Sequence, residues 1–469
     1  MSRSHYFLRG LGAAYLLILC TSISVMISVP VALHYLDKEA FGIWVVVTQI
    51  SGYLLMLEFG TSGSGIRLLM DHKDHAADGQ YGTMIKTLAC VQTVQAVILL
   101  LAGLAATPLL VRLLDVPSGM AAVFQGVWMS QVAVLSISFL GRIGSQLLTA
   151  HHRADLVYHS QSVLSVVNIV VMWLSFRAGT GLYSMVLANG IAVVLSLAVT
   201  LIAAKKLHLF APPEARGRVS RPAAKALFSF GGDLFFLAFG LTLLGSSQAP
   251  IITRVLGFEM AAVWGVATKL FTMAQQVVGR LLDSSASSLM EMVVRKERER
   301  LQMRFQDILA LTAALALWAA TTAAVCNGPL LEVWTRGRIA WPWINDVLMG
   351  AVLASMTITR MHIGLAGTTK IFRGLQFVYF FEGLLFAVLA YVMARRFGLA
   401  GILMSALFAD ILGAGVFGSR RTAAEFGTSA FTAGLRWLAI PLRGGAALIA
   451  LAALHGWVTR HTAAWPTLI

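Results

Sequence analysis

The most constraining feature of this 469-residue chain is a succession of long apolar runs, separated by short segments that contain most of the charge. A helix of roughly 20 apolar residues is long enough to cross the hydrocarbon core of a bilayer. Hydrophobic residues make up 58% of the chain and charged residues only 12%, whereas soluble domains have about 25% charged residues. The pattern excludes soluble enzymes and disordered chains, and it predicts an all-α polytopic membrane protein.

Charge clusters and Gly or Pro residues divide the apolar sequence into about twelve transmembrane helices, or thirteen to fourteen if the C-terminal tail adds spans. The expected spans are 11–36, 41–66, 87–111, 119–149, 156–176, 182–204, 226–256, 260–291, 308–335, 341–367, 374–394 and 398–419. A weaker thirteenth segment is 433–457. The first run is longer than the roughly 7–15 apolar residues of a signal peptide, so we interpret it as a transmembrane helix.

Lys and Arg are distributed unevenly between the alternate loops. With the N-terminus in the cytoplasm, 21 of them lie in cytoplasmic loops and 7 in outer loops. The positive-inside rule therefore predicts a multi-pass protein with a cytoplasmic N-terminus. The net charge of +15 then faces anionic membrane lipids, so that no nucleic-acid partner is expected. No loop is long enough to form a catalytic domain, which indicates that the protein is not an enzyme.

The sequence also contains an internal repeat at an offset of 220 residues. The segments that begin at Pro30 and Pro250 share six identities over 19 positions, among them Trp44 with Trp264. Such repeats are typical of transporters built from two related halves. We therefore expect a six-helix bundle at 1–204, a basic cytoplasmic linker at 205–225, a second six-helix bundle at 226–421 and a tail at 422–469. The two pseudo-symmetric bundles are expected to surround a central cleft.

The segment Glu39–Leu69 resembles the polysaccharide-biosynthesis branch of the multidrug/oligosaccharidyl-lipid/polysaccharide exporter superfamily. In that branch an FGxW segment opens the second helix, and a (D/E)FG segment followed by an Arg closes it. Here these are Phe41–Trp44, Glu58–Gly60 and Arg67. The resemblance implies a Wzx-type flippase of the bacterial inner membrane. Such a protein moves undecaprenyl-diphosphate-linked oligosaccharide for O-antigen (lipopolysaccharide), capsule or exopolysaccharide synthesis.

Ionisable residues inside spans are costly and usually face a protein or water-lined interior. Arg and Lys bind phosphate through charge-assisted hydrogen bonds, which suits a lipid diphosphate. The candidate substrate-binding residues are Lys269, Arg280, Arg254, Arg142, Arg360 and Gln276. The candidate residues for charge balance or ion coupling are Glu58, Asp233 and Asp283. Glu382 and Asp410 also lie within spans, where bridging of neighbouring helices is an alternative role.

Residue spacing places several of these groups on common helical faces. One polar face contains Asp233, Gly240, Ser247 and Arg254, which recur every seven residues. A second face contains Lys269, Gln276, Arg280 and Asp283, and a third contains Thr48, Ser51, Glu58 and Ser62. The alternative for Arg254 and Arg280 is that they extend to lipid headgroups at span ends. We expect no metal site, because Cys20, Cys90 and Cys326 lie apart in apolar runs.

Two other functions remain open at this point. A cation-coupled multidrug exporter of the same superfamily would share the fold and the repeat, but its cleft would be expected to be richer in acids. A membrane-embedded glycan ligase would be expected to have a large outer loop. We expect a monomer with H+ or Na+ as a coupling ion and no other cofactor. Its partners would be membrane lipids, the lipid-linked substrate and the polymerase and glycosyltransferases of the same pathway.

Overall fold

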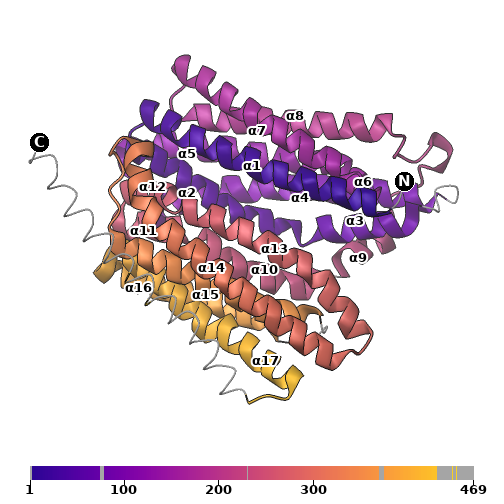
Figure 1. Cartoon of the computed structure of the whole chain (residues 1–469). Coiled ribbons are helices and arrows are strands. Elements are labelled where there is room, and N and C mark those ends of the chain that lie inside the picture. Colours follow the sequence, from indigo (N-terminus) through magenta and orange to yellow (C-terminus); the bar gives the residue numbers. More distant parts are fainter. Residues whose placement is uncertain are drawn as a thin grey trace, which may run out of the picture. The chain divides into compact units, whose positions relative to one another are not determined.

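The computed structural model describes residues 3–73, 79–229, 231–368 and 374–429, together with residues 446 and 450. Every secondary-structure element assigned in these ranges is helical (Figure 1). The chain divides into two compact units, residues 1–238 and 239–469. The expected all-α architecture is therefore confirmed for the described part of the chain.

The first unit is built from long helices with short connections. Its elements are α1 (Arg3–Tyr35), α2 (Lys38–Leu55), η1 (Met56–Glu58), α3 (Thr61–His72), α4 (Gln80–Leu113), α5 (Ser118–Leu140), α6 (Arg142–Ala150), α7 (Ala154–Arg177), α8 (Tyr183–Lys206), η3 (Pro213–Ala215), α9 (Arg221–Ser229) and the first half of α10 (Gly231–Ser246). Helix α7 packs against both α1 and α8, while α4 packs against α5. The short helix α9 lies against α3 and α4, so the basic segment before it belongs to this unit.

Glycines allow close helix packing inside the first unit. A side chain at Gly103 of α4 would lie 2.5 Å from Val132 of α5, and its absence lets the buried Trp128 donate its indole N–H to the Gly103 carbonyl at 2.9 Å. A side chain at Gly144 of α6 would lie 2.8 Å from the Leu201 nitrogen of α8. Small residues at helix contacts are typical of membrane bundles, in which close van der Waals packing drives association.

The second unit continues with α11 (Gln248–Leu256), α12 (Phe258–Ala267), α13 (Lys269–Val294), α14 (Arg298–Thr335), α15 (Trp343–Thr368), α16 (Leu375–Asp410), the π-helix η4 (Ile411–Gly415) and α17 (Val416–Phe426). Helix α15 packs against α13, α14, α16 and α17 and so lies at the centre of this unit. Helix α16 turns sharply at Gly398, whose φ of 58° and ψ of −137° are accessible only to glycine. The two arms of α16 lie on either side of this residue.

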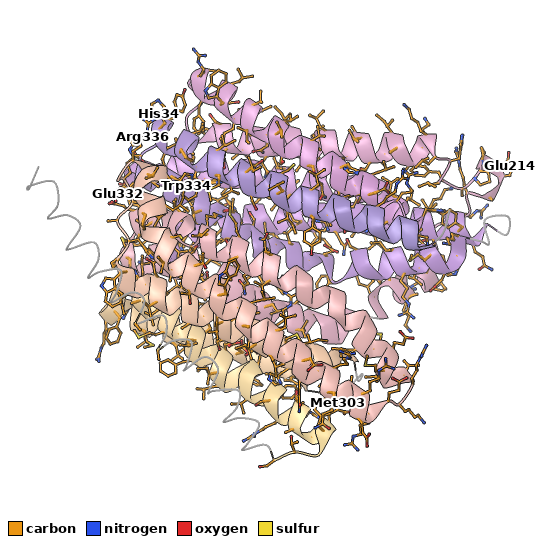
Figure 2. All side chains as sticks on the ribbon, viewed as in Figure 1. His34, Glu214, Met303, Glu332, Trp334 and Arg336 are labelled. Atoms are coloured by element: carbon orange, nitrogen blue, oxygen red, sulfur yellow. The ribbon has the colours of Figure 1, made fainter. Side chains whose placement is uncertain are left out.

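Segments that the sequence assigns to one side of the membrane lie together at one end of the first unit. The Tyr81 hydroxyl contacts His151 Nε2 at 2.9 Å and donates to the Leu209 carbonyl at 2.8 Å, which joins three segments expected in the cytoplasm. At the other end, Tyr35 stacks on Phe176 with 5.1 Å between ring centroids. Figure 2 labels Glu214 and His34 at these opposite ends of the unit.

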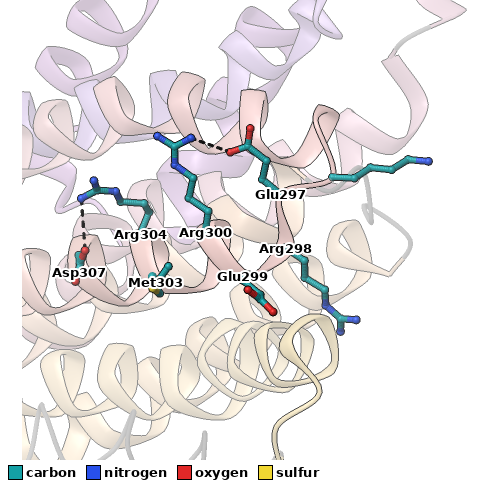
Figure 3. A pocket seen from close by; sticks show the side chains of 8 residues that line it. Glu297, Arg298, Glu299, Arg300, Met303, Arg304 and Asp307 are labelled. Carbon is teal, nitrogen blue, oxygen red and sulfur yellow. Dashed lines mark hydrogen bonds and ion pairs between the residues drawn. The ribbon is translucent and has the colours of Figure 1, made fainter.

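The second unit has the same arrangement. Arg298, the first residue of α14, donates to the Glu425 carbonyl at 2.5 Å, so the start of α14 and the end of α17 lie at one end of the unit. A charged concavity lies at the start of α14, where Arg300 pairs with Glu297 and Arg304 pairs with Asp307 (Figure 3). We call this the basic end of the second unit. Trp334 and Arg336 mark its opposite end (Figure 2).

The number of spans is consistent with a polytopic protein. In the described ranges, nine helices are long and apolar enough to cross a membrane, or ten if bent helices α10 and α11 form one span. One of the nine, Leu375–Phe426, has 52 residues and includes both expected segments 374–394 and 398–419. The expected span 260–291 corresponds to the short apolar helix α12 and the charged helix α13. The expected segment 433–457 lies outside the described residues.

The membrane orientation is testable by cysteine labelling. After Cys20, Cys90 and Cys326 are replaced by Ser, a Cys at residue 300 should react with a membrane-impermeant maleimide only in inverted vesicles, because it lies at the basic end. A Cys at residue 338 should react in intact cells, which makes it the matched control. Labelling at residue 300 in intact cells would contradict the predicted orientation.

Candidate functional site

The second expected span is broken in the first unit. Helix α2 ends at Leu55, a short 3₁₀ turn covers Met56–Glu58, and Phe59 and Gly60 both adopt left-handed backbone conformations with φ of 48° and 72°. Helix α3 then begins at Thr61. A bulky residue such as Phe in this conformation is strained, and strain of this kind concentrates at functional sites. The break is formed by the Glu58–Gly60 motif itself.

An ion pair lies at this break. Arg142 Nη1 lies 2.5 Å from Glu58 Oε2, and the two side chains are 22% and 24% exposed. The other carboxylate oxygen, Oε1, accepts from the Ser62 backbone N–H at 3.1 Å, at the start of α3. The Arg142 guanidinium also lies over the Phe139 ring, 3.9 Å from its centroid. The pair thus joins the broken second span to the start of α6.

Gln95 of α4 compensates for the backbone hydrogen bonds that the break removes. Its side-chain amide donates to the carbonyls of Leu57 and Glu58 at 3.1 and 2.9 Å, and its own carbonyl accepts from the Thr61 hydroxyl at 3.1 Å. Inside a membrane a non-helical segment persists only where protein groups or water satisfy its backbone. Gln95, which is 4% exposed, therefore stabilises the break.

Two more amides extend the network toward α6. Gln146 donates to the Ser62 hydroxyl at 3.2 Å, and Gln92 donates to the Gln146 side-chain carbonyl at 2.7 Å. Gln92 is 1% exposed, and its Oε1 atom accepts no hydrogen bond from the described residues. We refer to Glu58, Arg142, Ser62, Gln95, Gln146 and Gln92 as the polar cluster. Its three glutamines are not among the residues predicted from the sequence, which apart from Gln276 were chosen as ionisable groups within spans; amides within apolar runs were the available signal.

A second interruption lies in the second unit, between α12 and α13. Lys269 is the first residue of α13 and is partly buried. Asn327 of α14 donates to the carbonyl of Ala267, at the end of α12, at 3.1 Å. It also donates to Asp346 Oδ1 at 2.7 Å, and the Trp341 indole donates to the same oxygen at 2.8 Å. Asn327 therefore has the role at this break that Gln95 has in the first unit.

The other candidate residues are placed as follows. Arg360 of α15 is exposed, and a side chain at Gly279 of α13 would lie 3.3 Å from its Nη1 atom, so the guanidinium packs against that glycine. Gln276 is exposed on α13, one turn before Gly279. Arg254 is exposed at the end of α11. The side chains of Asp233, Arg280 and Asp283 lie outside the described residues.

The two acids that the sequence analysis set apart are buried and hydrogen-bonded. Glu382 Oε2 accepts from the Ala414 backbone N–H at 2.7 Å, and Asp410 Oδ2 accepts from Ser355 at 2.5 Å and Thr359 at 3.2 Å. Both carboxylates are at most 3% exposed. Each joins neighbouring helical segments of the second unit.

The prediction of a common polar face was wrong for two of the three faces, because their spans are not continuous helices. Ser247 separates α10 from α11, and the two helices are bent by 40°, so Gly240 and Arg254 do not share one straight face. The break at Phe59 and Gly60 likewise separates Ser51 from Ser62. Spacing predicts a common face only within one uninterrupted helix. The third face begins at Lys269 and lies on one continuous helix, α13.

The polar cluster has the chemistry of a charge switch. In the described conformation Arg142 neutralises Glu58, so the pair carries no net charge. A proton or a cation bound at Glu58 would weaken its attraction for Arg142, since only the charged carboxylate forms the ion pair. Because Glu58 also contacts the first turn of α3, a change at the carboxylate would act directly on the broken helix. A change of charge at Glu58 would therefore reach the backbone at the start of α3.

Comparisons with known proteins identify the fold. No family model matches the chain, and no curated protein matches its sequence. An inward-facing multidrug resistance MATE family transporter of the MOP superfamily superposes with a TM-score of 0.73 at 13% identity, over 89% of this chain and 99% of that one. The MATE multidrug transporter DinF-BH gives 0.63 at 14% identity, over 91% and 97%. A mutant of the Vibrio cholerae MATE transporter VcmN gives 0.60 at 14%, over 94% and 99%.

These likenesses extend over nearly the whole length of each chain. At such low identity they establish the fold alone. The protein therefore has the MATE transporter fold with two pseudo-symmetric halves, which confirms the fold class predicted from the sequence. The breaks described above are features of individual spans within this fold.

Proposed function

We propose that this protein is an ion-coupled exporter of amphipathic solutes that works by alternating access, with H+ or Na+ as the coupling ion. The observation that carries the proposal is the Glu58–Arg142 pair at the helix break. Glu58 is the single acid within the expected span 41–66. It is partly exposed, and it accepts a hydrogen bond from the backbone at the start of α3. Ion binding at this carboxylate would thus alter the geometry of a span, which is what coupling requires.

The likeness to multidrug transporters supports small organic molecules as the cargo. The three similar structures are all named as MATE transporters, two of them as multidrug transporters. Charge in the first unit agrees with this cargo, because Arg142 is neutralised by Glu58 and is not available as a bare cation for a diphosphate. On sequence grounds the multidrug exporter is the alternative to the flippase, and the comparisons favour the exporter.

The second candidate cargo is an undecaprenyl-diphosphate-linked oligosaccharide, moved across the bacterial inner membrane. It is supported by the Glu39–Leu69 resemblance, whose Glu58–Gly60 segment forms the break in the second span. Partly exposed bases in the second unit, Lys269 and Arg360, also suit phosphate. For this cargo the expected partners are the polymerase and glycosyltransferases of the same pathway, and the transporter would act as a monomer.

Reconstitution distinguishes the two cargoes. Purified protein in proteoliposomes with an imposed proton gradient is tested with a fluorescent cationic dye and, separately, with a fluorescent polyprenyl-diphosphate sugar. Ion-dependent movement of the dye alone would support the exporter. Movement of the lipid-linked sugar alone would replace it with the flippase, and movement of neither would contradict both. Repeating the assay with Na+ instead of a proton gradient identifies the coupling ion.

Lys269 gives a mutational test of the cargo. If Lys269 holds a diphosphate, Lys269→Glu should abolish surface polysaccharide in a complemented deletion strain, and Lys269→Arg should retain part of it because the charge survives. For a cationic cargo, Lys269→Glu should leave export intact or increase it. Lys206→Glu, at the exposed end of α8, is the matched control, and protein level is measured in the same membranes. Normal surface polysaccharide with Lys269→Glu would exclude phosphate binding there.

A further inference from the structure

A groove of about 460 Å³ lies on the surface of the second unit, between the first arm of α16 and the segment formed by η4 and α17. We call it the α16–α17 groove. Most of its lining residues are apolar, among them Phe377, Phe381, Leu412 and Phe417. Phe381 and Leu412 are 62% and 61% exposed, so the groove opens outward over much of its length.

The floor of the groove is shaped by the π-helix. The buried Glu382 carboxylate accepts from the backbone N–H of Ala414, and a side chain at Gly413 would lie 2.6 Å from Glu382 Oε2. Gly413 therefore makes the space in which the carboxylate reaches the π-helix backbone. π-helical turns are uncommon and are frequent at functional sites. This hydrogen bond joins the first arm of α16 to the π-helix beneath the groove.

One end of the groove is cationic. Arg420 and Arg421 line it, and the Arg421 guanidinium lies 5.2 Å from the centroid of the Phe417 ring, which is itself a wall residue. Both arginines belong to α17, whose last turn meets Arg298 at the basic end of the unit. Along the helix, Leu412 and Arg420 are separated by roughly 12 Å, at 1.5 Å per residue. The apolar part of the α16–α17 groove therefore extends over this length and ends at a pair of guanidinium groups.

We propose that the α16–α17 groove binds one anionic phospholipid from the membrane leaflet at the basic end of the second unit. The phosphate would lie against Arg420 and Arg421, and an acyl chain would lie along Phe381 and Leu412. Charge complementarity selects this occupant, because basic sites between transmembrane helices bind anionic headgroups. Guanidinium groups bind phosphate bidentately. The inference does not depend on which cargo the protein transports.

Native mass spectrometry of the full-length protein tests the proposal with phosphatidylglycerol as the probe and phosphatidylcholine as the zwitterionic comparison. One phosphatidylglycerol should remain bound under conditions that remove phosphatidylcholine. Arg420→Ala/Arg421→Ala should reduce the bound fraction about tenfold, as expected for the loss of charge-assisted hydrogen bonds. Arg420→Lys/Arg421→Lys should retain an intermediate fraction. Equal retention of the two lipids by the unmodified protein would overturn the proposal.

The chain offers a matched control on α16. Arg395 and Arg396 are also adjacent and exposed, but they lie near Gly398, away from the groove, and Arg395 contacts Tyr391. Arg395→Ala/Arg396→Ala should leave phosphatidylglycerol binding unchanged. An equal loss in both double variants would indicate attraction to net charge rather than a site, and would overturn the proposal.

A third variant tests the acyl-chain part separately. Leu412→Trp should fill the exposed groove and reduce phosphatidylglycerol retention without changing charge, while circular dichroism confirms retained helix content. A photoreactive benzoylphenylalanine at Phe381 should crosslink to lipid. A crosslink from this position to the chain's own segment 430–469 instead of lipid would show that the tail covers the groove, and this also would overturn the proposal. Displacement of the lipid by millimolar inorganic phosphate alone would reduce the site to a general anion site and reject the lipid.

Discussion

Glu58→Gln is expected to reduce transport tenfold to hundredfold while leaving the protein folded and inserted in the membrane. Gln preserves the size of the side chain and retains an acceptor for the Ser62 N–H at 3.1 Å. It removes the charge that binds Arg142 and the group that would take up the coupling ion. A hydrogen bond to a charged group is worth about 1.5–3 kcal/mol, which corresponds to that range of rate. The measurement is ion-driven dye or lipid-linked sugar movement in proteoliposomes.

The matched control is Asp155→Asn. Asp155 pairs with Arg153 at 3.2 Å near the start of α7, away from the break, and this pair should contribute little to transport. The double variant Glu58→Gln/Arg142→Gln should recover thermal stability relative to Glu58→Gln, because no unpaired base remains, but it should not recover ion dependence. Full ion-dependent transport by Glu58→Gln would show that the pair is structural and would remove the basis of the proposed coupling.

Gly240→Val is expected to prevent accumulation of folded protein. A side-chain carbon at Gly240 of α10 would lie 2.1 Å from the Tyr379 carbonyl oxygen of α16, and one at Gly383 would lie 2.6 Å from the Gly240 carbonyl. The two helices thus meet backbone to backbone. Overpacking against movable side chains costs about 1–3 kcal/mol, and here the obstacle is main chain, so the cost should exceed that range. Folded proteins are stable by only about 5–15 kcal/mol.

Gly245→Val on the same helix is the matched control, because nothing lies within 4 Å of a side chain added there. Both variants make the same change in helix propensity, so the difference between them isolates the α10–α16 contact. The measurement is fluorescence-detected size exclusion of detergent extracts, with a melting curve for any variant that remains monodisperse. A Gly240→Val protein with an unchanged melting temperature would contradict the close contact.

Much of the fold follows from the sequence because a bilayer imposes strict rules. Apolar length fixes where helices lie, and an offset of 220 residues indicates two related halves. The sequence does not reveal where a helix is interrupted. At Phe59 the left-handed backbone depends on Gln95, which is 37 positions from Glu58 and satisfies the carbonyls of the break. To predict such a contact, one must know how neighbouring spans are aligned along their lengths, and no local sequence pattern encodes this alignment.

The candidate site was predictable as residue types but not as a geometry. Glu58 and Arg142 were both selected for their charge within spans, yet they are separated by 84 positions, and their pairing depends on how α3 meets α6. The repeat does not help here, because residue 362, which corresponds to Arg142 at the 220-residue offset, is a histidine. His362 contacts the Thr422 hydroxyl at 2.9 Å. Symmetry of the fold therefore does not extend to the chemistry of these positions.

The turn at Gly398 bears on the biogenesis of the protein. Two spans follow one another in Leu375–Phe426, with one non-helical residue between them. No long polar loop therefore separates the insertion of the first span from that of the second. The insertion machinery would have to release the two arms together, as a preformed helical hairpin. In the predicted orientation this hairpin also carries Arg395 and Arg396 to the outer side, against the usual charge bias. Assembly of this region should therefore be all-or-none.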